Sequence, residues 1–455
     1  MGDIVQNTCS KVQSHVTNAG IWSTKHGLRS HLVSPEPFTL SSDQVSQLER
    51  LGEALVRFYH GANELYLRSD QEWVSEYLDI GKPDDLVRHA RMHYHKHSVP
   101  IIIRPDILIT KNGFVITELD SVPGGFGHLD CLSAAYADAG FDIVGSARGI
   151  RENFAKALRG AANVDDPVCA IIVSDESVDY LPEMTYLANE LRKIGLRAYT
   201  LCPNEVEFTE NGLFAGEMRI DLVYRFFELF DLLNIPKSEL VSYAARKKMA
   251  VITPPYKHYL EEKILLALLH NESLNDYWVK SLGDDNYRLL IDMISPTWIM
   301  DNRPVPPHAH ISGFIYRGRP IRDWREIMEG TQKDRRLVLK PSGFSELAWG
   351  SRGVRIGHDM PAAEWTETVD MALSSFNHSP YVIQPFHDGA LIGVKYLGND
   401  QIREMQARVR LCPYYFVADE KASLGGVLAT ACPKDKKLIH GMVDAVMMPC
   451  RSESQ

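Results

Sequence analysis

The chain has 455 residues, of which 45% are hydrophobic and 24% charged, and its formal net charge is −10. This length exceeds what one hydrophobic core usually supports, so we expect two or three domains or a composite fold. The acidic balance, without a broad basic region, argues against nucleic acid or an anionic membrane surface as the main partner.

The cysteines and the N-terminus bear on the cellular compartment. The seven cysteines are scattered without a CxxC pair, which argues against a zinc site or a disulfide framework and favours a reducing cytoplasm. The N-terminus lacks a basic segment followed by an apolar core, and no apolar run approaches the roughly 18 residues of a membrane span. We therefore expect a cytoplasmic protein, and the sequence leaves its oligomeric state open.

The first segment, residues 1–98, is predicted to be mostly helical. A helix is expected over residues 43–59, and its apolar positions recur on one face, which indicates a scaffold role: Leu48, Leu51, Leu55 and Phe58. Four histidines follow at positions 89, 93, 95 and 97. They could form a metal site, but no HExxH pattern or cysteine is nearby, so contacts with the carbonyls of a helix end are the favoured interpretation.

The second segment, residues 99–165, begins with a predicted β-hairpin. An apolar run over residues 99–110 is followed by a Lys-Asn-Gly turn at 111–113 and a second apolar run over 114–118. After the hairpin comes a glycine-rich turn, and residues 131–158 then have the periodicity of a helix.

Charged residues gather along this hairpin. Alternation places Glu118 and Asp120 on one face of the second strand, and Arg104 lies on the same face of the first strand as Asp106. Neighbouring carboxylates repel each other unless a cation offsets them, and hard oxygen ligands suit Mg²⁺. We therefore predict a phosphate and magnesium site in which Asp106, Glu118 and Asp120 bind the metal. The alternative is an edge hairpin whose charges face water.

The third segment, residues 166–255, has the pattern of an open α/β sheet. Apolar strands alternate with a helix expected over residues 180–194, and the strands are expected at residues 168–174, 197–202, 220–227 and 249–253. This predicts a Rossmann-like lobe that binds ligands at the carboxyl ends of its strands. Arg225 could hold a substrate carboxylate there, and a structural ion pair with Glu228 or Asp231 is the alternative.

The last segment, residues 256–455, contains a candidate phosphate flap. A strand at 337–339 delivers Lys340, and a loop from Ser342 to Gly353, which includes Gly350 and Ser351, precedes a second strand at 354–356. Glycine N–H groups approach anionic oxygens closely, and Lys340 can neutralise them. Walker A and Rossmann motifs are absent. A plain hairpin is the alternative, but its loop would be longer than most hairpin loops.

Two later strands add candidate ligand contacts. The stretch 379–389 is suited to line a purine pocket, in which the backbone after Gln384 could read adenine. The stretch 404–410 predicts a strand with Arg408 and Arg410 on one face, where they could bind phosphate or a carboxylate.

Taken in order, these motifs resemble those of a circularly permuted ATP-grasp ligase, similar to the synthetase domain of glutathionylspermidine synthase. The Arg104-Pro-Asp106 pair, the Glu118-Leu-Asp120 pair and Gly124-Gly125 match the order and spacing of that family, with Asp120 where the family has asparagine. The resemblance covers roughly residues 100–450. It implies an α/β fold (α+β overall), namely a permuted ATP-grasp fold with an inserted Rossmann-like lobe. The helical N-terminal region expected from periodicity has no counterpart in that family.

The resemblance also implies a reaction. Lys263 and Lys340 would contact the phosphates of ATP, and a small-molecule carboxylate would attack the γ-phosphate to form an acyl-phosphate, from which an amine displaces phosphate. Arg104 would stabilise the transferring phosphoryl group, Mg²⁺ would offset charge, and the closed flap would exclude water. The alternatives are a phosphotransferase that does not ligate and a nucleotide-binding module without catalysis.

Overall fold

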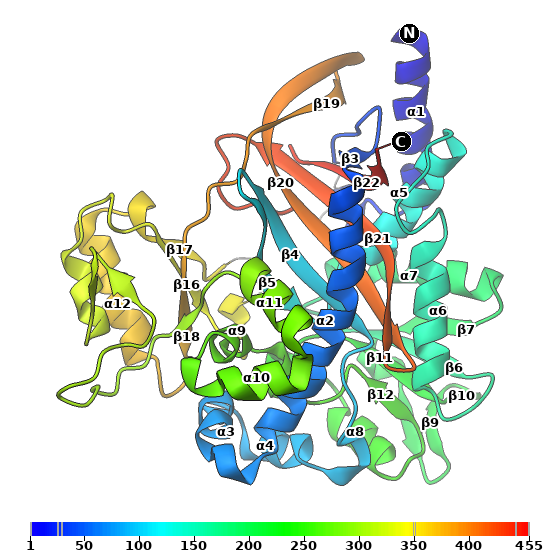
Figure 1. The fold of residues 1–455 in the computed structure, drawn as a ribbon. Coiled ribbons are helices and arrows are strands. Elements are labelled where there is room, and N and C mark those ends of the chain that lie inside the picture. Colours follow the sequence, from blue (N-terminus) through cyan, green and yellow to red (C-terminus); the bar gives the residue numbers. More distant parts are fainter. Residues whose placement is uncertain are drawn as a thin grey trace. The chain divides into compact units, whose positions relative to one another are not determined.

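The computed structural model describes residues 2–24, 27–28, 31–348, 350, 352–441 and 444–453. The fold is mixed α/β, with several sheets and many helices (Figure 1). Packing divides the chain into two compact units. Unit 1 comprises Met1–Val56, Pro100–Pro255 and Gly389–Gln455, and unit 2 comprises Arg57–Val99 and Tyr256–Asp388. The four consecutive segments expected from the sequence stay a prediction.

An extended sheet in unit 1 carries the predicted hairpin. Its strand order is β3-β22-β21-β20-β4-β5, with β19 paired to β20. The strand bounds are β3 Phe38–Leu40, β4 Ile102–Thr110, β5 Gly113–Asp120, β19 Ile392–Gly398, β20 Gln401–Ala418, β21 Lys421–Pro433 and β22 Val446–Ser452. The antiparallel pairing of β4 with β5 confirms the hairpin, and β20 confirms the strand predicted over residues 404–410.

Helices α5 (Phe126–Asp138) and α6 (Gly149–Ala161) contact β21 of this sheet (Figure 1), and α1 (Gly2–Asn18) contacts α5. The single helix predicted over residues 131–158 is wrong, because the chain breaks between α5 and α6. Gly140, Gly145 and Ser146 have positive φ angles of 96°, 84° and 77° there. A right-handed helix cannot continue through such conformations.

A second sheet of unit 1 is parallel throughout, in the order β12-β11-β6-β7. The bounds are β6 Val168–Val173, β7 Arg197–Leu201, β11 Leu222–Phe226 and β12 Val251–Thr253, with α7 Leu181–Lys193 and α8 Ser238–Arg246 packed on them. This confirms the open α/β sheet, and β6 is buried along its whole length, as expected for a strand covered on both faces.

Smaller elements complete unit 1. The sequence did not predict the antiparallel sheet of β8 (Glu207–Thr209), β9 (Gly212–Ala215) and β10 (Met218–Ile220), and the strand expected over residues 220–227 is β11 alone. The remaining elements are β1 Ser23–Thr24, β2 Gly27–Leu28 and the 3-10 helices η3 Val178–Tyr180, η4 Pro203–Glu205 and η5 Leu229–Asn234.

Unit 2 combines helices with an antiparallel sheet in the order β13-β18-β16-β17. The strand bounds are β13 Trp298–Ile299, β16 Leu337–Pro341, β17 Arg355–Ile356 and β18 Tyr381–Pro385, and a separate pair is formed by β14 Ile315–Tyr316 and β15 Arg319–Pro320. One face of this sheet packs into an apolar core with Trp365 of α12 (Ala362–Ser374), to which β16 contributes Leu337 and Leu339.

The other helices of unit 2 come from two distant parts of the chain. The bounds are α3 Glu72–Asp79, α4 Asp84–Ala90, α9 Ile264–Leu269, α10 Asn275–Leu282, α11 Asp284–Met293, and the 3-10 helices η1 Ser69–Gln71, η2 His93–His95, η6 His258–Glu261, η7 Glu272–Leu274, η8 Trp324–Glu329, η9 Glu346–Ala348 and η10 Gly357–Asp359. Helix α9 begins directly after Lys263, and all six of its residues are buried.

The N-terminal helix prediction is confirmed by α2 (Ser42–Tyr66), within which the boundary between the units falls after Val56. The four residues of the predicted stripe, 48, 51, 55 and 58, are fully buried. His95 Nε2 lies 2.8 Å from the carbonyl oxygen of His89 in the last turn of α4, which agrees with the helix-end interpretation of the histidines. Over the described ranges, no helix combines the length and apolar character needed to cross a membrane.

Candidate functional site

The charged hairpin residues of unit 1 lie on one face of the sheet. In the register of β4 and β5, Arg104 pairs with Asp120 and Asp106 pairs with Glu118. Because directly paired residues project to the same side of a sheet, the four side chains share a face, as predicted. Alternation within two adjacent strands therefore accounts for this part of the site.

Arg104 lies at the centre of an ion-pair cluster. Its Nε is 2.9 Å from Asp106 Oδ1 and its Nη2 is 3.0 Å from Asp120 Oδ2, while Nη1 donates a hydrogen bond of 3.3 Å to the Gly124 carbonyl. From β20, Arg410 Nη1 binds the second oxygen of Asp106 at 2.7 Å. Asp106 is thus bound by two guanidinium groups, one of them from a strand about 300 residues away.

Burial and charge both act on these groups. Burial raises the pKa of Asp120, and Arg104 opposes that increase. Burial lowers the pKa of Arg104, but Asp106 and Asp120 raise it well above its ordinary value, so the guanidinium stays charged. The two arginines balance two of the three carboxylate charges on this face.

Asp106, one of the three predicted metal ligands, is bound by protein groups at both carboxylate oxygens. Both oxygens of Asp106 are engaged, Oδ1 by Arg104 and Cys412 and Oδ2 by Arg410. Within the described part of the chain, no three His, Cys, Asp or Glu side chains gather so that they could hold a metal. The structure brings the predicted ligands together as an ion-pair cluster, and their assignment to Mg²⁺ stays a prediction.

The glycine turn after β5 is held on both sides by protein groups. Tyr414 donates a 2.7 Å hydrogen bond to the Gly124 carbonyl. The N–H groups of Gly125 and Gly127 donate to Glu183 Oε1 at 2.8 and 2.9 Å, at the N-terminus of α5. These amides therefore bind an internal carboxylate. Burial raises the pKa of Glu183 to about 7 even though these amides lower it.

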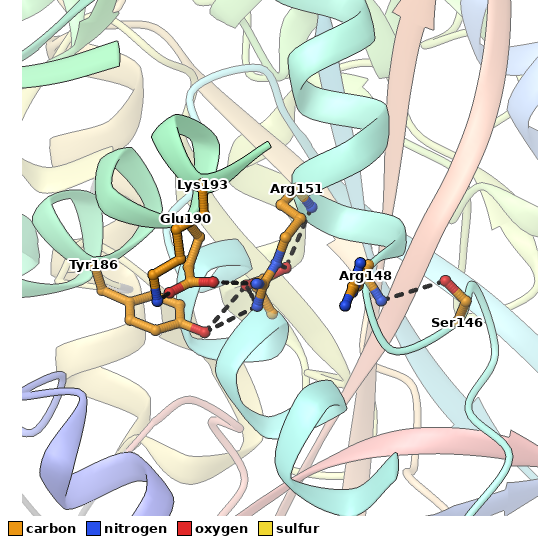
Figure 2. Close-up of polar contacts among 7 residues, drawn as sticks. Ser146, Arg148, Arg151, Tyr186, Glu190 and Lys193 are labelled. Carbon is orange, nitrogen blue, oxygen red and sulfur yellow. Dashed lines mark hydrogen bonds and ion pairs between the residues drawn. The ribbon is translucent and has the colours of Figure 1, made fainter. Parts of the chain in front are cut away.

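A buried network fixes the helix that carries Glu183. Figure 2 shows Tyr186 and Glu190 of α7 facing Arg151 of α6. Arg151 binds both oxygens of Asp130 in α5, at 3.0 and 2.5 Å, and also binds Glu190, while Tyr186 donates to Asp130 at 3.2 Å. The network joins α5, α6 and α7, so it holds Glu183 of α7 against the start of α5.

The other arginines predicted to bind substrate bind the protein backbone instead. Arg225 is fully buried and donates to the carbonyls of Phe227, Pro254 and Pro255 at 2.7, 2.9 and 3.2 Å. These bonds hold the segments after β11 and β12 together, and the role of Arg225 as a carboxylate ligand stays a prediction. Arg408 donates to the carbonyls at 434 and 436, so of the two arginines predicted to share a face it is Arg410 that joins the charged cluster.

Unit 2 carries the predicted nucleotide residues on neighbouring strands. In the register of β16 and β18, Lys340 pairs with Val382 and Gln384 pairs with Val338, so all four project to the face opposite the apolar core. Gln384 is buried and donates to Thr297 Oγ1 at 2.9 Å. The pairing of β16 with β17 confirms the hairpin that encloses the flap loop.

The start of that loop is bound to the residues before α9. Lys263 Nζ donates to the carbonyl of Ser342 at 3.2 Å, and the N–H of Ile264 donates to Ser342 Oγ at 3.1 Å. Farther along, Gly350 adopts a φ of 62°, and the N–H of Gly353 donates to the carbonyl of Leu347 at 2.8 Å. Ser351 lies outside the described residues.

Sequence reasoning missed several residues that hold these sites. Glu183 and Tyr414 support the glycine turn, and Lys82 and Glu262 lie under the start of the flap loop. The doublet Glu261-Glu262 beside Lys263 was a usable signal for Glu262. Lys82 and Glu183 lie in stretches with no local pattern that would single them out.

No family model matches the chain, and no curated protein is detectably similar to it in sequence. Among solved structures, it is similar to a glutathione synthetase-like effector of Globodera pallida, with a TM-score of 0.62 and 12% identity over 99% of this chain and 97% of that one. A second similarity is to a candidate γ-glutamylcysteine synthetase of Methylobacillus flagellatus, with a TM-score of 0.42 and 11% identity over 88% and 85% of the two chains. The chain therefore shares its fold with a glutathione synthetase-like protein.

Proposed function

We propose that the chain is an ADP-forming ligase that joins a small-molecule carboxylate to an amine at the expense of ATP. The observation that carries this proposal is the face of the unit 2 sheet opposite its apolar core, where Lys340 and Gln384 lie on adjacent strands and the flap loop follows directly. A strand-borne ammonium group before a glycine-containing loop suits the phosphates of a nucleotide.

The likeness to a glutathione synthetase-like protein supports the same reaction class. We also propose that the fold is a permuted ATP-grasp fold in which the parallel sheet of unit 1 is an inserted lobe. The resemblance to glutathionylspermidine synthase is part of the same proposal. We further propose that the protein acts in a reducing cytoplasm. The seven free cysteines are compatible with that compartment.

Each unit is assigned its own part in the reaction. In unit 2, Lys263, Lys340 and Ser342 would bind phosphate oxygens, and the backbone after Gln384 would bind adenine. In unit 1, the fixed guanidinium of Arg104 would stabilise the negative charge that develops as a phosphoryl group moves to the substrate carboxylate. Its two carboxylate partners hold it in one orientation, so little reorganisation would accompany the reaction.

The test is a screen for ADP release over pairs of carboxylates and amines. We expect one or more pairs to release ADP and form an amide, and we expect Lys340→Met to abolish that release, because the ammonium group that neutralises the phosphates is lost. The control is Lys333→Met, which removes an exposed lysine of the same unit. Equal activity of Lys340→Met and the wild type would contradict the assignment.

A nucleotide-binding module without catalysis is the second candidate. It is favoured by the engagement of Asp106 with two arginines, which neutralises a carboxylate that the sequence assigned to a catalytic metal. Calorimetric titration separates the two candidates. Tight binding of ATP without ADP release across the whole panel would support the module, whereas ADP release that requires both substrates would support the ligase.

A further inference from the structure

A buried ion pair lies beneath the start of the flap loop in unit 2. Lys82 Nζ is 2.5 Å from Glu262 Oε1, and both side chains are only 1% exposed. Glu262 also accepts a hydrogen bond from the hydroxyl of Ser342 and, at 3.2 Å, one from the N–H of Phe344. One carboxylate thus binds a lysine and two residues of the loop.

The partners of this pair are far apart in the sequence. Lys82 lies between α3 and α4, in the helical segment before residue 100, and Glu262 lies between η6 and α9. Ser342 and Phe344 are about 80 residues farther along. The pair therefore joins the N-terminal part of unit 2, for which the sequence indicated no role in ligand binding, to the loop predicted to bind phosphate.

The loop fits closely against Glu262. A Cβ atom added to Gly343 would lie 2.5 Å from the carbonyl oxygen of Glu261 and 3.0 Å from Glu262 Cδ. The Phe344 ring lies beside Lys82, with its centroid 5.9 Å from Nζ. A side chain at position 343 would push the loop away from the Glu262 carboxylate. Because Gly343 has no side chain, the loop can lie directly against that carboxylate.

The carboxylate is ionised in this setting. Burial alone raises the pKa of Glu262, but Lys82 and Ser342 together lower it below its ordinary value. A buried charge is tolerated only when hydrogen bonds and a partner charge satisfy it. Here the satisfying groups include Ser342 and Phe344, so the loop and the ion pair stabilise each other.

Two proposed phosphate ligands depend on the same contact. Ser342 donates to Glu262 through its hydroxyl and accepts hydrogen bonds from the N–H and Nζ of Lys263 through its carbonyl. A shift of Ser342 would therefore also displace the carbonyl that accepts a hydrogen bond from the side chain of Lys263.

We propose that the Lys82–Glu262 ion pair is a positioning element that fixes Ser342 and Lys263 for the phosphates of a nucleotide. The inference deepens the proposed function and rests on it. Neither Lys82 nor Glu262 is assigned a contact with the nucleotide, and both act through the start of the flap loop.

The test uses the full chain and compares Lys82→Met, Glu262→Leu and the double variant Lys82→Met/Glu262→Leu. Removing one partner leaves the other buried charge unpaired, whereas replacing both by apolar residues of similar size avoids that penalty. The double variant should therefore fold where a single variant does not. Lys82→Arg keeps the charge and should retain the wild-type behaviour. Asp301→Asn is the matched control, because Asp301 binds Tyr77 of α3 and Arg303, not the loop.

The first readout is amide hydrogen exchange over residues 342–348 without nucleotide, followed by thermal unfolding and calorimetric binding of adenylyl imidodiphosphate. We expect the double variant to keep a near wild-type unfolding temperature, to lose exchange protection at least tenfold in this stretch and to bind the nucleotide at least tenfold more weakly. Asp301→Asn should change neither exchange nor binding.

Unchanged exchange protection over residues 342–348 in the double variant would overturn the positioning role, regardless of the affinity for the nucleotide. Lost protection with unchanged nucleotide affinity would also overturn it, because the loop would then move without affecting the phosphates. If the wild-type chain binds no nucleotide, the proposed function itself fails, and the exchange data separate that result from failure of the ion-pair anchor.

Discussion

Arg104 is bound on two sides by carboxylates and on a third by a backbone carbonyl, so its guanidinium group has one orientation. A planar group with several donors can bind Asp106 and Asp120 at the same time, which the single point charge of a lysine cannot do. The positions of the guanidinium donors, more than the charge alone, therefore determine that both carboxylates gather around Arg104.

For this reason we predict that Arg104→Lys lowers kcat for ADP release by about 100-fold or more, the size of effect seen when one transition-state donor is removed. The KM for ATP should change little, because the assigned nucleotide contacts lie in unit 2. Steady-state kinetics tests this, with Arg403→Lys on the exposed part of β20 as the control. A rise in KM with unchanged kcat would contradict the role given to Arg104.

Glu183 provides a prediction about pH. Its pKa is raised from an ordinary value of 4.5 to about 7 by burial. Below pH 4.5 the carboxyl is protonated in both folded and unfolded chains, whereas above pH 7 it is ionised in both and the folded state carries the full cost of burying the charge. Stability should therefore fall as the pH rises from 4.5 to 7, by roughly 3 kcal/mol.

Glu183→Gln cannot ionise, but its amide oxygen can still accept from the N–H groups of Gly125 and Gly127. Urea unfolding of this variant should lack the pH-dependent loss, so the difference in free energy of unfolding between variant and wild type should change by roughly 3 kcal/mol between pH 4.5 and pH 8. The exposed Glu217→Gln should leave the wild-type slope intact. Parallel curves for Glu183→Gln and the wild type would show that this carboxyl does not titrate in the expected range.

At the scale of elements, turns decide where the chain can bring residues together. The turn before α5 places the backbone of Gly125 against Tyr414 of β20, and the break between α5 and α6 lets Arg151 face Asp130. Both features depend on residues with positive φ, which are far easier for glycine than for residues with a Cβ atom.

Two glycines with similar φ angles distinguish the free-energy cost of backbone strain from the cost of a steric clash. Gly125 and Gly140 have nearly the same φ, 93° and 96°, but a Cβ at Gly125 would lie 2.7 Å from the Tyr414 hydroxyl, whereas Gly140 has nothing within 4 Å. We expect Gly140→Ala to lose about 1 kcal/mol from strain alone, and Gly125→Ala to lose roughly 1–3 kcal/mol more, because the tyrosine must move. Urea unfolding of both variants measures the difference. An equal decrease in the free energy of unfolding for both variants would mean that the turn accommodates the new Cβ atom without moving Tyr414.

At the scale of the whole molecule, each unit is assembled from segments that are not consecutive in the sequence. Such long-range packing buries side chains from all parts of the sequence, including the cysteines. Six of the seven are buried, and Cys202 is the partly exposed one. Burial raises the pKa of all seven thiols.

We therefore expect a neutral aromatic disulfide reagent to label about one thiol per native chain within minutes, and all seven only after denaturation, because the thiolate is the reactive form and burial blocks access. Absorbance of the released thiolate measures the count. Cys202→Ser should remove the rapid phase. Rapid labelling of several thiols in that variant would contradict the packing of unit 1, which holds all seven cysteines.

The sequence by itself determined the features that depend on local periodicity. Alternation within two adjacent strands placed Arg104, Asp106, Glu118 and Asp120 on one face, and apolar runs predicted the parallel sheet of unit 1 and the strand that carries Lys340. The helix predicted over 131–158 failed because apolar periodicity alone did not reveal a break that depends on backbone conformations at the intervening turn.

Only the tertiary structure decided which charges meet. Arg410 reaches Asp106 across 304 positions, and Lys82 reaches Glu262 across about 180. Nothing in the local pattern at either end encodes these pairings, because they follow from strand order and helix packing. The same packing brings two arginines to Asp106, because a buried carboxylate is tolerated only when a partner charge and hydrogen bonds satisfy it.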